Sequence, residues 1–269
     1  TSASAPPATA GAGRGARRGD QAFRGAAEGA VNVVHRMSKG EHSPRRTSSP
    51  SVAAIIPAWN EAATVGAVVY AALDARTVDE VVVVDNASTD DTAAVAAAHG
   101  ARVVHEPTPG KGEALRAGVA ATPEAEILVF LDADLVGLRP EHVDDLVTTV
   151  VEGRADMACG LFDRGPLANP LFLTSLPVLT GQRALRRELF EALDLADVRG
   201  YRVEAALNTL VARQGLVRHD RVLPGLWHRT KEEKLASPVV GHATKLAMLA
   251  SACWSYVRCA VALRPQPAG

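Results

Sequence analysis

The sequence predicts an α/β fold built on a doubly wound, mostly parallel sheet, and three observations point to it. Short runs rich in Val, Ile and Leu alternate with segments whose apolar residues recur at helical spacing. The runs are apolar throughout, as strands are when helices cover both faces of a sheet. Several of them lead directly into acidic or other polar residues. Sheets of this class bind ligands at the carboxyl ends of their strands.

Six strands are expected from residue 51 onward, and most of them are short apolar runs bounded by polar or turn-forming residues. They cover residues 52–56, 81–84, 102–105, 127–131, 156–161 and 217–223. The first strand is expected to stop at Pro57, and the second is expected to end at Asp85.

Helices are expected between these strands. The first places apolar residues at helical spacing from Val65 to Leu73. The segment 88–91 carries a Ser…Asp pair that resembles a capping box, and Gly100 closes the helix that it starts. A third helix covers 112–121, and Pro140 is well suited to be the first residue of a fourth.

Composition and charge exclude several classes of protein. The chain has 269 residues with 29 basic against 30 acidic side chains, a formal net charge of −1, which argues against nucleic acid as a partner. Cys159, Cys253 and Cys259 have no metal-ligand spacing and form no disulfide framework, so a cytoplasmic location is expected. The sequence contains no run of about 18 apolar residues, so no transmembrane helix is predicted. Neither a G-x-G-x-x-G after the first strand nor a P-loop pattern occurs.

The acidic triad Asp132-Ala133-Asp134 is the most informative short motif of the chain. It follows the apolar run 127–131 directly, so two carboxylates one residue apart are presented where a buried strand ends. Such oxygens suit Mg²⁺ or Mn²⁺ bridged to a diphosphate. A solvated turn is the simpler alternative.

Three other segments carry polar residues in the same kind of place: Pro57–Glu61, Val84–Thr92 and Pro109–Leu115. In the third, glycines on both sides of Lys111 let the backbone approach a ligand while the ammonium group meets phosphate. Each segment has a simpler structural alternative. These are a strand-to-helix turn with Asn60 as N-cap, a capped helix and a surface turn.

Taken in their order along the chain, these three segments and the acidic triad resemble the motifs of family 2 glycosyltransferases of the GT-A fold. The resemblance implies a metal-dependent glycosyltransferase that moves a hexose from a UDP- or GDP-linked sugar, with Mg²⁺ or Mn²⁺ as the cofactor. It also implies a set of residues that bind the donor nucleotide: Pro57, Ala58, Asn60, Glu61, Asp85, Ser88, Lys111, Asp132 and Ala133.

The resemblance also implies what some of these residues do. Asp85 would accept a hydrogen bond from the base, because an ionised carboxylate only accepts. Lys111 would meet the donor diphosphate. Asp132 and Asp134 would hold the cation against the two phosphates, with Asp134 counted among the catalytic residues.

The second half of the chain is similar to polyprenyl-phosphate glycosyltransferases and glucosyl-3-phosphoglycerate synthases in two segments, Leu179–Glu188 and Gly200–Glu204. The similarity implies that Glu204 is the catalytic base, although a first-turn glutamate favoured by the helix dipole is the alternative. It implies that His228 is the third metal ligand. It also implies three acceptor-binding residues: Gly181, Arg183 and Arg229.

Four segments are expected along the chain. Residues 1–50 form a disordered leader, rich in Ala, Gly, Arg, Ser and Pro. Residues 51–160 form the half that binds the nucleotide sugar, 161–235 the half that binds the acceptor, and 236–269 a C-terminal helix and tail. Because the first methionine is Met37, it is left open whether the residues before it belong to the natural protein.

Several alternatives remain open at this point. The acceptor is either a small phosphorylated metabolite or a polyprenyl phosphate, and both inversion and retention are open. The apolar segment 239–263 is expected to pack on the domain or to form a homodimer, and contact with a membrane surface is a third option. A nucleotide-sugar-binding homologue without turnover is disfavoured, because Asp132, Asp134 and Glu204 are all present. A sugar-1-phosphate nucleotidyltransferase would have a basic, Gly-rich loop in place of residues 57–61.

Overall fold

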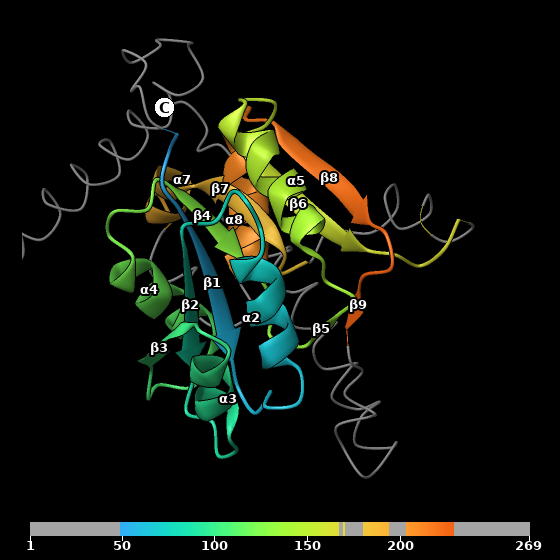
Figure 1. Cartoon of the computed structure of the whole chain (residues 1–269). Helices are drawn as coiled ribbons and strands as arrows, with labels where there is room; N and C mark the ends of the chain where they lie inside the picture. Colours follow the sequence, from blue (N-terminus) through green and yellow to red (C-terminus); the bar gives the residue numbers. More distant parts are fainter. Residues whose placement is uncertain (1–48, 167–168, 170–179, 194–202, 229–269) are drawn as a thin grey trace, which may run out of the picture. The chain divides into compact units, whose positions relative to one another are not determined.

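The structure is a computed structural model that describes residues 49–166, 169, 180–193 and 203–228 (Figure 1). Nearly all of the expected leader lies outside the described residues. The expected C-terminal helix, Arg229 and residues 200–202 lie outside them as well. The expected boundaries between the two binding halves therefore stay predictions.

A seven-stranded sheet forms the centre of the described part, in the order β3-β2-β1-β4-β7-β6-β8 (Figure 1). Strands β3, β2, β1 and β4 run parallel to one another, β8 is parallel to β6, and β7 is antiparallel to both of its neighbours. The strands are β1 Val52–Ala58, β2 Glu80–Asp85, β3 Arg102–His105, β4 Ile127–Phe130, β6 Met157–Phe162, β7 Arg183–Arg186 and β8 Arg218–Leu223. The expected α/β fold with a mostly parallel sheet is confirmed.

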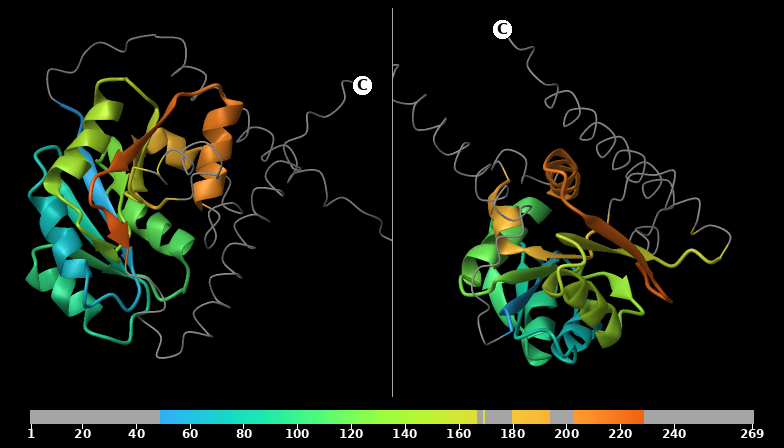
Figure 2. Two further views of the ribbon diagram at one scale, coloured as in Figure 1. Left: turned by 90° about the vertical axis from the view of Figure 1, so that its right-hand side faces the viewer. Right: turned by 90° about the horizontal axis from the view of Figure 1, so that it is seen from above.

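Helices cover both faces of this sheet (Figures 1 and 2). Alternate residues of β1 point to opposite faces: Ile56 packs in the cluster that contains α2 and α5, and Ile55 packs in the one that contains α4, α7 and α8. Because both faces are buried, the strand is apolar throughout. The helices are α2 Val65–Leu73, α3 Thr92–Ala98, α4 Lys111–Ala121, α5 Pro140–Val151, α7 Arg187–Glu191 and α8 Val203–Arg213.

The first strand does not stop at Pro57, as the sequence predicted, but runs on to Ala58. In a parallel strand successive residues direct their hydrogen-bonding groups to opposite neighbours. Ala58 accepts from Asn86 on the β2 side, and Ile55 accepts from Leu131 on the β4 side. Pro57 therefore faces the β4 side beyond the last paired residue of β4, where its missing N–H costs no hydrogen bond.

The expected capping box at α3 is wrong, although Gly100 does follow the helix with a positive φ of 97°. The helix begins at Thr92, and its N-cap Asp91 makes no side-chain capping bond. Instead, the Asp90 carboxylate accepts hydrogen bonds from both the backbone N–H and the hydroxyl of Thr92. The Asp90 carboxylate, two residues before Thr92, thus bonds a backbone N–H at the start of α3, as the Ser…Asp pair was expected to do.

Three strands had no counterpart in the sequence prediction. One is the antiparallel β7, and the other two, β5 Leu135–Val136 and β9 Trp227–His228, pair with each other in a small antiparallel sheet. Such two-residue strands exist only because a distant partner is present, so no local pattern announces them. In the described part of the chain, no helix is both long and apolar enough to cross a membrane.

Candidate active site

The candidate site is formed where loops from the carboxyl ends of β1, β2 and β4 meet the first turns of α4 and α8. The loops after β1 and β2 are joined directly: the Asn60 N–H donates to the Ser88 hydroxyl (3.0 Å), and the Asn60 side-chain oxygen accepts from the Thr89 N–H (2.8 Å). Asn60 has a positive φ of 54°, which asparagine adopts more readily than most residues. The N–H of Glu61 donates to the Thr92 hydroxyl (2.8 Å). The structure thus brings together the predicted donor residues of two loops.

Asp85 ends β2 and is almost fully buried. One of its carboxylate oxygens accepts from the Ser88 N–H (3.2 Å), and the other lies 3.2 Å from Nδ1 of His105 at the end of β3. His105 was not singled out in the sequence, because its proximity to Asp85 depends on the pairing of β2 with β3. The loop contacts hold the Asp85 carboxylate in one orientation.

Lys111 is the first residue of α4 and lies between two carboxylates. Its Nζ atom is 2.6 Å from Oδ1 of Asp132 and 2.7 Å from Oε1 of Glu204. The residue before it, Gly110, has a φ of +148°, a conformation that favours glycine. The loop that was predicted from its two glycines therefore delivers the ammonium group to both the candidate metal ligand and the candidate base.

The electrostatics of this cluster keep Lys111 and Asp132 charged. Burial by itself lowers the pKa of Lys111, but the carboxylates of Asp132 and Glu204 outweigh burial and raise that pKa above its ordinary value. Burial likewise raises the pKa of Asp132, but the charge of Lys111 and the hydrogen bonds from Lys111 and Gln182 outweigh it and lower the pKa. At neutral pH the site therefore contains an ion-paired ammonium and carboxylate.

Two neighbours in the segment before β7 surround the Asp132 carboxylate. The Gln182 side-chain amide donates to Oδ2 of Asp132 (2.8 Å), and its own oxygen accepts from the Thr180 hydroxyl (2.5 Å). A Cβ atom on Gly181 would lie 2.2 and 2.3 Å from the two Asp132 oxygens, so only glycine allows this approach. Sequence reasoning missed Gln182, and the nearest signal was the singled-out segment in which it lies.

Glu204 lies in the first turn of α8 and is buried. Lys111 holds its Oε1 atom, whereas its buried Oε2 atom has no hydrogen-bond partner among the described residues. A buried carboxylate oxygen without a donor is costly, so this atom is suited to accept a hydrogen bond from a bound ligand.

Two of the predicted metal ligands, Asp132 and Asp134, lie in the turn before β5, and the third, His228, lies on β9. β9 places His228 opposite Leu135, the residue that follows Asp134. The His228 ring packs against Phe162 with 4.6 Å between ring centroids, and its charge is one of the influences that lower the pKa of Asp132.

Within the described residues, no three His, Cys, Asp or Glu side chains are gathered tightly enough to form a metal shell. The donor set nevertheless fits Mg²⁺ or Mn²⁺, because carboxylate oxygens with one imidazole are ligands that these ions accept. Asp132 also already holds a cation, the ammonium group of Lys111. A divalent ion would take over part of that role.

The prediction that Arg183 binds the acceptor conflicts with its position. The side chain is 1% exposed, and its guanidinium donates to the carbonyl oxygens of Thr180 and Glu204 and to the side chain of Asn208. Because the N–H groups of the guanidinium are used by these partners inside the core, Arg183 supports the site from the protein interior. Gly181 lies at the Asp132 carboxylate, and Ala133 is buried in the turn between the two aspartates.

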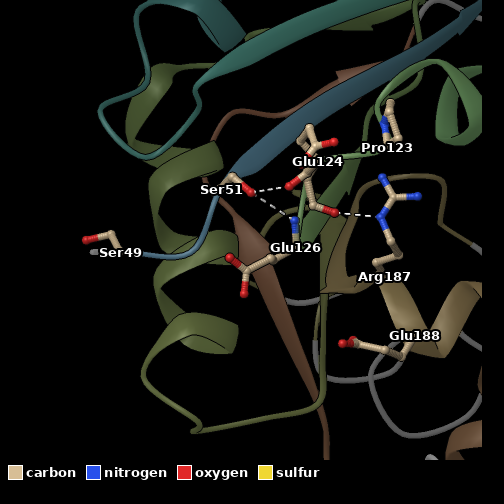
Figure 3. Close-up of a pocket in the computed structure, with 8 residues that line it drawn as sticks. Ser49, Ser51, Pro123, Glu124, Glu126, Arg187 and Glu188 are labelled. Carbon is tan, nitrogen blue, oxygen red and sulfur yellow. Dashed lines mark hydrogen bonds between the residues drawn. The ribbon is translucent and has the colours of Figure 1, made fainter. Parts of the chain in front are cut away.

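A pocket of about 410 Å³ opens at the other end of the sheet, near the start of β1 and the residues before β4 (Figure 3). Its lining includes Ser51, Glu124, Glu126 and Arg187, and the Arg187 guanidinium donates to the carbonyl oxygen of Ala125 (2.6 Å). None of the predicted site residues lines this pocket. We therefore place the candidate site at the Lys111 cluster, on the chemistry of its side chains.

The fold is of the GT-A type, and comparison with known proteins agrees. The family model described as "Glycosyl transferase family 2" matches residues 53–204, more than half of the chain. The chain belongs to this family. It is 34% identical over 195 residues to the glucosyl-3-phosphoglycerate synthase of Mycobacterium tuberculosis (strain CDC 1551 / Oshkosh), which covers 58% of this chain and 59% of the synthase. The chain thus spans about three fifths of that relative's length.

An uncharacterised glycosyltransferase of Mycobacterium tuberculosis (strain CDC 1551 / Oshkosh) is 39% identical over 163 residues, with 59% of this chain and 70% of that protein covered. Among solved structures, the M. tuberculosis glucosyl-3-phosphoglycerate synthase in complex with Mn²⁺, UDP-glucose and phosphoglyceric acid matches with a TM-score of 0.59 and 32% identity. The match covers 70% of this chain and 78% of that one. The same synthase in complex with Mg²⁺ and UDP matches with a TM-score of 0.56, 30% identity, and 74% and 75% of the two chains.

Proposed function

We propose that this chain transfers a glucosyl group from UDP-glucose to a hydroxyl group of a phosphorylated acceptor, with phosphoglycerate as the acceptor and Mg²⁺ or Mn²⁺ as the cofactor. The observation that carries the proposal is the Lys111 ammonium group held between Asp132 and Glu204, at the ends of the strands where α/β sheets bind ligands. The named synthase and its complexes, at 30–34% identity, support the choice of donor, metal and acceptor.

The donor nucleotide is assigned to the joined loops after β1 and β2. Asp85 is held in place by Ser88 and His105 and can still accept a base N–H through its remaining lone pairs. Asn60 and Glu61 belong to the same joined loops. Ala58 and Pro57 form the strand end beneath it, and Ala133 lines the turn that carries the two aspartates.

The diphosphate is assigned to Lys111, whose ammonium group is a compact charge that pairs well with phosphate oxygens. Asp132, Asp134 and His228 would hold the cation. When bound, that ion neutralises the charge that develops on the departing nucleoside diphosphate. As the phosphates arrive, Lys111 exchanges at least part of its contact with Asp132 for a contact with phosphate.

Glu204 is proposed as the base that takes the proton from the acceptor hydroxyl. Lys111 holds one oxygen of this carboxylate, and the second oxygen, buried and without a partner among the described residues, is the one that would receive the proton. Glu204→Gln keeps the shape and removes the basic oxygen. We expect normal UDP affinity and a turnover about 10²-fold lower in this variant.

A polyprenyl phosphate is the second acceptor that the sequence left open. The segment that favoured it, 181–188, forms β7 and the start of α7, and most of it is buried. It therefore adds little to the case for a lipid acceptor. Peripheral membrane contact and a homodimer through residues 239–263 stay predictions, because that segment lies outside the described residues.

Nucleotide binding tests the proposal first. We expect UDP with Mn²⁺ to raise the melting temperature by several degrees, about 2.7 kcal/mol of stabilisation at a hundredfold excess over Kd, and GDP to raise it less. Asp134→Asn should remove the Mn²⁺-dependent part. Asp74→Asn, the same chemical change on an exposed residue that follows α2, should keep it. The proposal fails if neither nucleotide stabilises the protein.

A transfer assay then identifies the acceptor. Phosphoglycerate and a polyprenyl phosphate are offered separately with UDP-glucose and Mn²⁺, and the products are identified by mass spectrometry. Product with phosphoglycerate supports the proposal, and product with the lipid alone overturns the acceptor assignment. Nucleotide binding without any product would favour the non-catalytic homologue.

A further inference from the structure

Asn86 lies in the segment Val84–Thr92, and its side chain is buried. The proposed function gives this side chain no role. Asn86 follows Asp85 at the end of β2 and is 6% exposed. Its amide group donates to the carbonyl oxygens of Glu106 (3.1 Å) and Thr108 (2.7 Å), and its oxygen accepts from the N–H of Gly110 (2.7 Å). All three hydrogen bonds go to one segment, residues 106–110, which ends immediately before Lys111.

This segment has few other means of attachment. Two of its five residues are prolines, Pro107 and Pro109, which have no N–H to donate. The Thr108 N–H bonds within the segment, to the Glu106 carboxylate (2.7 Å). Gly110, the N-cap of α4, has no side chain that could cap the helix. Apart from Asn86, the hydrogen bond that ties the segment to the sheet in the described structure runs from the Glu106 N–H to the Asp85 carbonyl oxygen (3.0 Å).

We propose that Asn86 is a positioning residue. It holds residues 106–110 against the end of β2 and thereby sets where the Lys111 ammonium group stands between Asp132 and Glu204. We call the three hydrogen bonds between Asn86 and residues 106–110 the clamp. The clamp does not depend on a bound nucleotide. Its effect on nucleotide binding rests on the proposed function, in which Lys111 meets the diphosphate.

Two substitutions separate the parts of this clamp. Asn86→Ala removes all three hydrogen bonds, and the released carbonyl oxygens can turn to water because the segment lies at the surface. Asn86→Asp keeps an acceptor for the Gly110 N–H but places an oxygen against two carbonyl oxygens. Since like partial charges then face each other, this variant should loosen the segment at least as much as Asn86→Ala.

Hydrogen–deuterium exchange on the ligand-free protein tests the clamp directly. We expect peptides that cover residues 106–115 to exchange about tenfold faster in both Asn86 variants than in the wild type, as the loss of roughly one to two net hydrogen bonds implies. Thr149→Val is the matched control: it removes a buried hydrogen bond inside α5, far along the chain from the segment. Unchanged exchange at 106–115 in the Asn86 variants overturns the proposal.

A double-mutant cycle on UDP affinity tests whether Asn86 acts through Lys111. Asn86→Ala should raise the Kd for UDP about tenfold in the protein with Lys111, but less than about twofold in a Lys111→Ala background. A purely structural role would lower the melting temperature and give equal factors in both backgrounds, and that result overturns the proposal. If the wild type binds no nucleoside diphosphate, the proposed function fails, and the exchange experiment alone decides the clamp.

Discussion

Lys111 places one positive charge between two carboxylates, and this arrangement decides the chemistry of the site at the scale of single residues. Asp132 comes from the end of β4 and Glu204 from the start of α8, so one side chain joins two separate parts of the chain. Gln182 donates to the other oxygen of the Asp132 carboxylate, and Gly181 leaves room for that carboxylate. The site is therefore assembled around a network of ion pairs.

Replacement of Lys111 by methionine should show what that charge contributes. The variant leaves two acidic groups close together in a partly buried place, and we expect it to lose roughly 2–4 kcal/mol of unfolding free energy at pH 7. Urea unfolding measures this loss. Lys111→Arg, which keeps the charge, should lose less than half as much. Equal stability of the methionine variant and the wild type would show that the cluster contributes no net stability.

At the scale of elements, β7 and α8 are tied together by Arg183. The guanidinium lies inside the core and donates to the carbonyl oxygens of Thr180 and Glu204, the second of which is in the first turn of α8. The residue that was expected to bind the acceptor thus holds the helix that carries the candidate base. An antiparallel strand inserted between β4 and β6 makes this contact available.

Arg183→Met should therefore destabilise the protein by about 2–4 kcal/mol, because buried carbonyl oxygens lose their donors. Arg186→Met is the matched control: it is the same change in the same strand, at a half-buried position, and should cost less than about 1 kcal/mol. Urea unfolding of both variants tests this. Equal losses would mean that the apolar stem of Arg183 matters and its hydrogen bonds do not.

At the scale of the whole molecule, the order of the strands determines which distant residues meet. β1 lies between β2 and β4, so the loops after all three open on one end of the sheet, and the pocket shown in Figure 3 lies at the other. The chain's stability should depend on pH through the charged cluster at the first of these ends. Asp132 is the member whose pKa is lowered by folding.

The sign of that dependence follows from linkage. Because folding lowers the Asp132 pKa, its ion pair contributes stability above the unfolded value of about 3.9, and this contribution is lost as pH falls through the folded value. The stability difference between wild type and Asp132→Asn should therefore be largest near pH 7 and shrink steadily as pH falls below about 4. Urea unfolding from pH 7 to 3 measures it, with Thr149→Val as a control whose deficit should not change with pH. A constant deficit in Asp132→Asn would contradict the assignment.

Much of the fold is encoded locally and was therefore predictable. The apolar runs of β1, β2, β4 and β6 and the apolar stripes of α2 and α5 record which faces are buried, and their bounds agree with the structure within about two residues. The positions of Asp85, Lys111 and Asp132 were predictable for the same reason, because all three lie at strand or helix ends. Those positions follow from the order of elements along the chain.

By itself, the sequence determined the α/β class, the strand ends at which ligands would bind and the residue types available there. Only the tertiary structure decided that Lys111 pairs with Asp132 and Glu204, that Gln182 orients Asp132, and that Arg183 is internal. These contacts join residues 21 to 93 positions apart in the chain. Whether a guanidinium faces solvent or core depends on the strand order around it, which no local pattern contains. That is the physical reason why the chemistry of each element was readable in advance and the way the elements meet was not.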